Sequence, residues 1–182
     1  MNTNSSEPAQ AAWRKWAARD HSWAQAMHRS SERLLVFRVL KSVSWLSDGI
    51  LWYGTVLLLP WIGGASGTAC ALRLLVLGSV NLTIYAVTKR HFARPRPFVT
   101  CQGVSARARS LDEHSFPSGH VIHAVSFGIV LSTYYAGLEW IVWPFAVLVA
   151  LSRVVLGLHY PSDVLVGALI GAGSARLILM LF

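Results

Sequence analysis

The chain has 182 residues, of which 54% are hydrophobic and 13% are charged, and its formal net charge is +8 at neutral pH. This is the length of a single domain, and a water-soluble fold could not hide so large an apolar fraction. A basic chain can also indicate nucleic-acid binding, but proteins of that class keep a polar, soluble surface. We therefore expect an anionic lipid as the partner rather than nucleic acid.

The first 33 residues are polar and basic, and they lack the continuous apolar core of a secretory signal peptide. One helical face carries large apolar side chains and the other carries basic ones: Trp13, Trp16, Trp23 and Met27 against Arg14, Lys15 and Arg29. This pattern predicts an amphipathic helix lying in a membrane interface. We treat residues 1–33 as a segment separate from the domain formed by residues 34–182.

Five apolar segments follow, each near the roughly 20 residues that a helix needs to cross hydrocarbon: 49–63, 69–88, 119–137, 139–157 and 162–182. The stretch 34–47 is also apolar but contains Arg38 and Lys41, which a lipid-exposed span tolerates poorly. Short connections make sequential segments antiparallel neighbours. The predicted fold class is all-α: an integral-membrane helical bundle with five or six transmembrane helices, preceded by the amphipathic helix.

Single residues within these segments carry further expectations. Gly167 and Gly171 form a GxxxG spacing, which indicates close contact between helices. Tryptophans near segment ends are typical of the aromatic belts at a membrane surface: Trp45, Trp52, Trp61, Trp140 and Trp143. For Trp52, packing inside the bundle is the alternative.

The stretch 89–120 is basic and has no long apolar run, so we expect a loop outside the hydrocarbon. Three polar clusters lie where segments meet the membrane surface: Lys89 to Pro97, Ser115 to His120, and Ser152 to Asp163. Helix counting places all three on one side, because the chain leaves through 119–137 and returns through 139–157. We therefore expect the clusters to share a pocket.

The residue types in these clusters indicate recognition of a tetrahedral anion. Lys89, Arg96 and Arg153 supply permanent positive charge and several donors suited to phosphate oxygens. Ser118 and Gly119, which follow a proline, resemble a helix start, where free backbone N–H groups and the helix dipole favour an anion. Gly119 also permits a close approach of phosphate to the backbone.

Two histidines complete the predicted site. A helix beginning at Pro161 places Asp163 in its first turn, where the carboxylate can fold back on His159. The carboxylate would fix the imidazole tautomer and leave the other nitrogen free to attack phosphorus. His120 could protonate the leaving alkoxide and then deprotonate the attacking water. The scheme requires no metal and no cofactor.

These clusters resemble the three-part signature of the type 2 phosphatidic acid phosphatase (PAP2) superfamily. The matching positions are Lys89 six residues before Arg96-Pro97, then Pro117 to His120, then Ser152-Arg153 five residues before His159 and three more before Asp163. The helical arrangement extends the resemblance to about residues 49–182. The resemblance implies a metal-independent lipid phosphatase in which His159 becomes phosphorylated. It also implies an active site on the outer, periplasmic face of a bacterial inner membrane.

Other polar residues near the motifs are expected to lie outside the catalytic set. A solvated or headgroup-binding loop is the expected place of four arginines: Arg90, Arg94, Arg107 and Arg109. A solvated loop is likewise expected for Asp112, Glu113 and His114, with access control or headgroup recognition as the alternative. His123 is expected to line the pocket or to pack, and not to bind a metal.

The predicted reaction is hydrolysis of a phosphomonoester or pyrophosphate on a lipid. Undecaprenyl pyrophosphate and phosphatidylglycerol phosphate are the favoured substrates, and lipid A is the alternative. Two other classes remain open: a non-hydrolytic phosphate-lipid binding or transport component, and a haloperoxidase that holds vanadate in an equivalent site. The paired histidines and Asp163 argue against the first, and the membrane-heavy composition argues against the second. No obligate protein partner is indicated.

Overall fold

The computed structural model describes residues 7–110 and 112–182, with side chains from residue 15 onward. Regular structure in these residues is helical, apart from one isolated bridge between Pro95 and His114. The elements are α1 Glu7–His28, the 3-10 helix η1 Arg29–Glu32, α2 Leu34–Leu46, α3 Ile50–Phe92, α4 Pro97–Thr100, α5 Gly119–Tyr134, α6 Glu139–Val155 and α7 Pro161–Leu181. The predicted all-α class is confirmed for this part of the chain.

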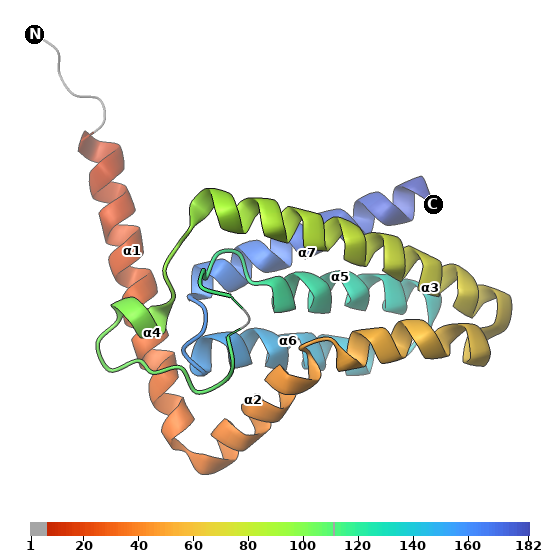
Figure 1. Cartoon of the computed structure of the whole chain (residues 1–182), viewed down its shortest axis with the longest axis horizontal. Coiled ribbons are helices and arrows are strands. Elements are labelled where there is room, and N and C mark those ends of the chain that lie inside the picture. Colours follow the sequence, from red (N-terminus) through yellow and green to blue (C-terminus); the bar gives the residue numbers. More distant parts are fainter. Residues whose placement is uncertain (1–6, 111) are drawn as a thin grey trace, which may run out of the picture.

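Helix α3 is a hairpin of two antiparallel arms (Figure 1). The turn is made at Gly64, whose φ of 55° and ψ of −131° leave the helical region and are strained for residues with a side chain. At Gly67 a Cβ atom would lie 2.0 Å from the carbonyl oxygen of Leu59, so the two arms meet backbone to backbone. The arms correspond to the predicted segments 49–63 and 69–88.

The two arms of α3 surround the central helix α5 together with α6 and α7 (Figure 1). Buried apolar side chains from all four helices form the main core, among them Leu74, Leu77, Phe127, Val149 and Ile178. Helix α5 is apolar nearly all round, and other helices cover most of its faces. This is expected for a helix at the centre of a bundle.

Close contact between α5 and α7 is confirmed at both glycines of the GxxxG spacing. A Cβ atom on Gly167 would lie 2.8 Å from the carbonyl oxygen of Ser118, and one on Gly171 would lie 2.5 Å from that of Ile122. Glycine at both positions therefore lets α7 approach the backbone of α5. The first of these contacts lies at the N-terminus of α5, where the predicted anion site begins.

The five tryptophans predicted to lie near segment ends divide into one buried residue and four exposed ones. Trp52 is 8% exposed and packs edge to face against Phe127 and Phe145, so the interior alternative is confirmed for it. The other four are exposed, as lipid-facing side chains must be: Trp45, Trp61, Trp140 and Trp143.

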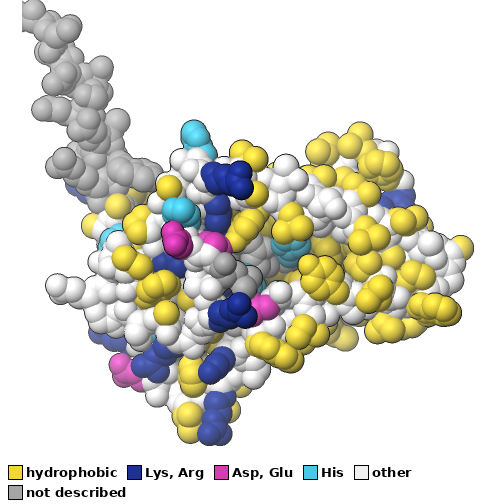
Figure 2. Space-filling view, viewed as in Figure 1, with side chains coloured by type: hydrophobic (Ala, Val, Ile, Leu, Met, Phe, Trp, Pro, Cys, Tyr) yellow, Lys and Arg dark blue, Asp and Glu magenta, His cyan; other side chains and the backbone are white. Residues whose placement is uncertain are grey.

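The outside of the bundle is apolar over the half that contains the α3 turn, whereas Lys and Arg side chains gather at the opposite end (Figure 2). Helices α3 and α7 are long and apolar enough to cross a membrane, and α5 is apolar but shorter, with 16 residues. At 1.5 Å per residue α2 spans only about 20 Å, which is short of a hydrocarbon core of about 30 Å.

Helix α1 lies across the basic end of the bundle and packs on α6 and α7 (Figure 1). Trp16 and Trp23 are exposed, but Met27 is half-buried against the ends of α2 and α6. At Met27 the predicted apolar face packs against the bundle, because the last turns of α1 dock there. The side chains of Trp13 and Arg14 lie outside the described residues.

Candidate active site

The three polar clusters meet in a cavity of about 340 Å³ at the basic end of the bundle. The end of α3, the 93–118 loop, the start of α5 and the α6–α7 connection all contribute to its wall. Six of the eight predicted site residues line it: Lys89, Arg96, Gly119, His120, Arg153 and His159. The structure thus brings together side chains that are up to 70 positions apart in the chain. Ser118 and Asp163 are fully buried directly behind this wall.

His159 is held in the α6–α7 connection with one ring nitrogen facing a cation. Its backbone N–H donates to the carbonyl oxygen of Arg153 at 2.9 Å. The Nη1 atom of Arg96 lies 3.3 Å from Nε2 of His159 and donates to the carbonyl oxygen of Leu158 at 2.8 Å. Arg96 is itself buried, so this contact is shielded from solvent. Of the two ring nitrogens, Nε2 is thus the one that faces Arg96.

The other ring nitrogen of His159 lies near Asp163 without a hydrogen bond. Nδ1 is 3.7 Å from Oδ2 of Asp163 and has no hydrogen-bond partner among the described residues. Helix α7 begins at Pro161 as predicted, and Oδ2 accepts the backbone N–H of Tyr160 at 2.9 Å in a capping box. The carboxylate therefore folds back as expected, but its Oδ2 atom is hydrogen-bonded to the helix start and not to His159.

Burial is the main influence on the pKa of His159, and it lowers that pKa well below 6.5. The nearby charges of Arg153, Arg96 and Lys89 act in the same direction. The imidazole is therefore neutral at physiological pH, with a lone pair available on one ring nitrogen.

The start of α5 carries two of the residues predicted to bind an anion, Ser118 and Gly119. Ser118 is the N-cap residue, and its buried Oγ atom has no hydrogen-bond partner among the described residues. The Ser118 N–H donates to the carbonyl oxygen of Asp163 at 3.1 Å, which ties α5 to α7. At Gly119 a Cβ atom would lie 2.7 Å from the ring of Tyr85, so glycine is required here for packing.

Arg153 is buried and supported by a helix outside the three motifs. Its Nη1 atom donates to Oγ of Ser44, in α2, at 2.6 Å. Its Nε atom has no hydrogen-bond partner among the described residues. The guanidinium therefore keeps donor capacity toward the cavity that it lines.

Asp112 belongs to the site, so the expectation of a solvated loop is wrong for it. Its Oδ1 atom lies 2.6 Å from Nζ of Lys89 and 3.0 Å from Nη2 of Arg96, and Tyr85 donates its hydroxyl to Oδ2. Burial raises the pKa of Asp112, but the hydrogen bonds from Lys89 and Tyr85 outweigh this and leave the pKa far below its usual value. The Asp112 carboxylate is held in the site because it pairs with Lys89 and Arg96. Glu113 is exposed, as expected.

Arg94 is also part of the site's framework and not a solvated residue. Its Nη1 atom donates to Oδ1 of Asp163 at 2.7 Å, and its Nη2 atom donates to Asp20 of α1 at 2.7 Å. The guanidinium lies 3.8 Å from the ring centre of Tyr160. These partners outweigh burial and raise the pKa of Arg94. Arg90 and Arg109 are exposed as expected.

Sequence reasoning missed Asp48, which pairs with His120. Its Oδ1 atom lies 2.5 Å from Nε2 of His120. Asp48 precedes the first apolar segment and belongs to none of the motifs, so no spacing signal identified it. His123 lines the cavity as expected and donates from Nδ1 to the carbonyl oxygen of Gly119 at 2.9 Å.

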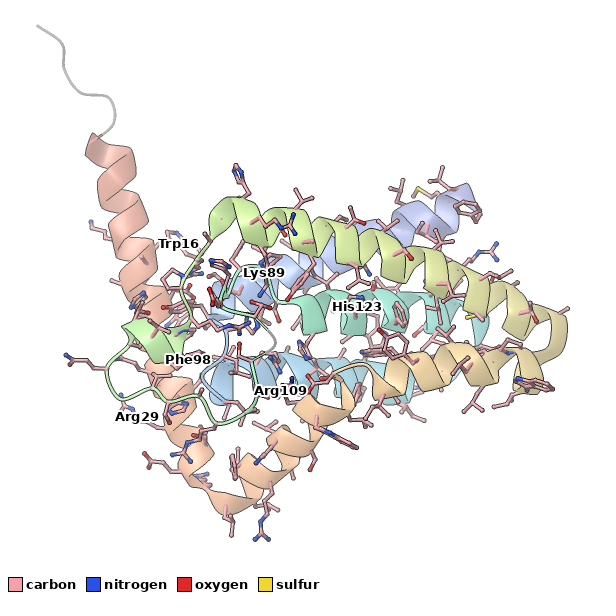
Figure 3. All side chains as sticks on the ribbon, in the orientation of Figure 1. Trp16, Arg29, Lys89, Phe98, Arg109 and His123 are labelled. Carbon is pink, nitrogen blue, oxygen red and sulfur yellow. The ribbon has the colours of Figure 1, made fainter. Side chains whose placement is uncertain are left out.

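Figure 3 shows Lys89 among the polar side chains near the end of α3, and His123 further along α5 towards the middle of the bundle. The cavity continues from this polar end between α5 and the arms of α3, where Trp52, Leu74 and Leu82 line it. The site thus joins a cationic end to an apolar passage. Within the described residues, no three His, Cys, Asp or Glu side chains are grouped as metal ligands would be.

The model of the PAP2 superfamily matches residues 68–182. Undecaprenyl-diphosphatase BcrC of Bacillus subtilis is 33% identical over 125 residues, which is 68% of this chain and 63% of the relative. Bacitracin transport permease protein BcrC of Bacillus licheniformis is 36% identical over 80 residues, 44% of this chain and 39% of the relative. An undecaprenyl-diphosphatase of Sulfolobus acidocaldarius is 31% identical over 94 residues, which is 51% of this chain and 46% of the relative.

Two solved structures share the fold. LpxE of Aquifex aeolicus superposes with a TM-score of 0.76 at 24% identity, covering 87% of this chain and 93% of that one. The PAP2-type phosphatidylglycerolphosphate phosphatase of Bacillus subtilis superposes with a TM-score of 0.76 at 23% identity, covering 92% of this chain and 86% of that one. The matches to the three curated relatives span between 39% and 63% of their lengths.

Proposed function

Because the chain belongs to the PAP2 superfamily, we propose that it is a membrane phosphatase that removes phosphate from a lipid through a phosphohistidine formed on His159. The observation that carries the proposal is the convergence of three cations and two histidines on one cavity, with Nε2 of His159 facing Arg96. Binding alone needs the cations but not an oriented, neutral imidazole.

In the first step, Lys89, Arg96 and Arg153 bind the phosphate oxygens, and the N-terminus of α5 contributes backbone N–H groups. The phosphate must compete with Asp112 for two of these cations. Nε2 of His159 attacks phosphorus as the bond to the lipid oxygen breaks, and His120 gives a proton to that oxygen. The cations stabilise the charge on the equatorial oxygens in the transition state.

In the second step, His120 takes a proton from water, and the resulting hydroxide attacks phosphorus. The bond between phosphorus and His159 breaks, and inorganic phosphate leaves. Asp163 stabilises the positive charge that the ring of His159 carries while it is phosphorylated. None of these steps requires a metal or a cofactor.

The proposed substrate is a lipid phosphomonoester or pyrophosphate, with undecaprenyl pyrophosphate or phosphatidylglycerol phosphate favoured. Two curated relatives are named undecaprenyl-diphosphatases, and one structure with this fold is a phosphatidylglycerolphosphate phosphatase. Lipid A is the alternative. The apolar passage beside Trp52 and Leu82 supports a substrate with a long tail.

We place five crossings in the membrane: the two arms of α3, then α5, α6 and α7. Helix α2 is not counted as a sixth because it carries Arg38 and Lys41, which a lipid-exposed span tolerates poorly. The exposed Trp16 and Trp23 of α1 fit an interfacial helix beside the site. The family resemblance implies that this end lies on the periplasmic face of a bacterial inner membrane, and we propose that orientation. The cations at the same end would favour the cytoplasmic side.

Purified protein in detergent with EDTA tests the proposal directly. The expected result is release of inorganic phosphate from at least one member of a panel running from phosphatidic acid to undecaprenyl pyrophosphate, phosphatidylglycerol phosphate and lipid A. Vanadate, which mimics phosphate in a trigonal transition state, should inhibit the release. Absence of turnover on the whole panel would contradict the proposal.

A second candidate is a phosphate-lipid binding or transport component, since one curated relative is named a transport permease. It would bind the same lipids in the same cavity without releasing phosphate. Lipid binding without hydrolysis by the wild-type protein would favour it over the phosphatase.

A further inference from the structure

Asp48 lies in the short connection between α2 and α3, with its backbone held on both sides. Its N–H donates to the carbonyl oxygen of Trp45 at 3.1 Å, and Gly49, with a φ of 135°, accepts the N–H of Tyr53 at 2.9 Å. The connection is therefore a defined turn. The Asp48 side chain lines the active-site cavity and is partly shielded, with 25% exposure.

The contact with His120 uses one particular ring nitrogen. Nε2 of His120 lies 2.5 Å from Oδ1 of Asp48, and the His120 side chain is only 10% exposed. Because a carboxylate only accepts hydrogen bonds, Nε2 must carry the proton of this contact. Nδ1 is then the nitrogen of His120 that remains for the substrate.

The end of α2, directly before this turn, supports a second motif residue. Ser44, one helical turn before Asp48, accepts a hydrogen bond from Arg153 at 2.6 Å. The segment 44–48 therefore contacts one histidine and one arginine of the site from outside the family match, which covers residues 68–182. Two separate contacts from one short segment indicate that it contributes to the site and is not only a connection.

We propose that Asp48 is a positioning residue for the proton donor His120, an inference that rests on the phosphatase function proposed above. Its carboxylate holds Nε2–H, so that Nδ1–H points at the lipid oxygen. As the P–O bond breaks, the Nδ1 proton moves to that oxygen and leaves a neutral imidazole still bonded to Asp48 through Nε2–H.

A purely structural role for Asp48 is the alternative, because an acidic residue beside the N-terminus of α3 would stabilise that helix. The two roles differ in how they depend on the leaving group. An alkoxide is a poor leaving group and needs a proton in the transition state, whereas a nitrophenolate leaves without one. Loss of a positioned proton donor should therefore slow cleavage of the P–O bond in alkyl phosphates but not in nitrophenyl phosphates.

The test compares Asp48→Asn with wild type on two substrates: dodecyl phosphate and a nitrophenyl phosphate carrying the same alkyl tail. We expect kcat/KM for dodecyl phosphate to fall by roughly 10² or more. For the nitrophenyl substrate kcat/KM should fall by less than about threefold, because kcat/KM reports the steps up to departure of the leaving group and not the later attack by water. His120→Ala should show the same selectivity, and the double variant should lose little more, because both changes remove one function. Glu113→Gln, at an exposed acidic residue of the same end, should keep both rates.

An equal loss on both substrates, or no loss on either, would overturn the inference. Wild-type protein inactive on both substrates would overturn the phosphatase function and the inference with it, so the two failures are distinguishable. Elution as a single species and an unchanged unfolding midpoint in detergent establish that the variant is folded. Asp48→Ser, which keeps a small polar side chain in the turn, is the second variant, with the same selectivity expected.

Discussion

The Nδ1 atom of His159 lies 3.7 Å from the Oδ2 atom of Asp163, beyond hydrogen-bond distance. The carboxylate oxygen is instead engaged by the backbone N–H of Tyr160 at the start of α7. Catalytic hydrogen bonds are often long in free enzymes and shorten when the substrate binds. The Asp163 carboxylate therefore has two roles: it caps helix α7, and it orients the imidazole of His159. Substitutions at His159 and at Asp163 should have different effects on activity, because only His159 is the proposed nucleophile.

His159→Ala should abolish phosphate release, because it removes the side chain proposed to carry the phosphate in the covalent intermediate. Asp163→Asn should leave residual activity, with kcat reduced by roughly 10²–10⁴, because the ring keeps its backbone anchors. The activity of both variants is measured as release of inorganic phosphate from a lipid phosphate in detergent.

Acid-labile labelling supplies the control for these two variants. Wild type and Asp163→Asn should trap phosphate from radiolabelled substrate on protein in a form stable to base and labile to acid, and His159→Ala should trap none. Labelling that survives in His159→Ala would contradict the assignment of the nucleophile.

The pH dependence follows from the lowered pKa of His159. Burial and the charges of Arg153, Arg96 and Lys89 lower that pKa well below 6.5. Attack requires the neutral ring, so His159 should remain competent as pH falls until well below 6.5. Arg153→Gln removes one cation and should raise the pKa, which moves the acidic limb of kcat/KM to higher pH. Because the same substrate is used for both proteins, its own titration cancels. A limb that stays in place or moves to lower pH would contradict the electrostatic explanation.

The fold and the motif residues were predictable because both follow from local pattern. Apolar segments of membrane-spanning length gave α5, α6, α7 and both arms of α3, and helix counting alone placed His120 and His159 at one end. The GxxxG spacing likewise predicted the backbone contact at Gly167, which the structure confirms. These features depend on periodicity and on connection length, which a sequence displays directly.

The partners of the motif residues were not predictable, because they come from distant segments that carry no spacing signal. Asp20, Asp48 and Asp112 each meet a basic or imidazole side chain of the site, at separations of up to 74 positions. From the sequence alone, an acidic residue in a polar segment is expected to be exposed to solvent. Tertiary packing around an excess of buried cations determines which carboxylates become buried beside them.

Asp20 joins α1 to the catalytic end, so its substitution should loosen that helix. Asp20 is buried and accepts from Arg94 and from the backbone N–H of Ser162 at 3.1 Å. Asp20→Asn removes the charge that balances Arg94 and should cost about 1–3 kcal/mol of stability. A lower unfolding midpoint in detergent and faster tryptic cleavage at the exposed Arg29 are the expected readouts.

Arg19→Gln is the matched control for Asp20→Asn, because Arg19 is the neighbouring residue and is exposed. Its midpoint and cleavage rate at Arg29 should equal those of wild type. Equal stability of Asp20→Asn and Arg19→Gln would contradict the proposed role of the Asp20 and Arg94 pair.

The five-crossing arrangement predicts which positions share a side of the membrane. Ser30, in η1, and Arg109, in the catalytic loop, should face one side, and Ala65, at the turn of α3, should face the other. Single cysteines at these exposed positions, in a background with Cys70 and Cys101 replaced by serine, can be tested with a membrane-impermeant maleimide. We expect Ser30→Cys and Arg109→Cys to react in intact cells and Ala65→Cys only after permeabilisation. Opposite labelling of Ser30→Cys and Arg109→Cys would instead show a sixth crossing.

The α5–α7 contact makes Gly167 sensitive in both stability and activity. A Cβ atom there would lie 2.8 Å from the carbonyl oxygen of Ser118, whereas nothing lies within 4 Å of one on Gly173 in the same helix. Gly167→Ala should cost about 1–3 kcal/mol by overpacking. It should also reduce kcat/KM, because α7 would push against the residue that begins the anion-binding helix. Gly173→Ala should match or slightly exceed wild type in unfolding midpoint, because alanine favours the helix. Similar behaviour of the two variants would show that the close approach of α7 does not set the geometry at Ser118.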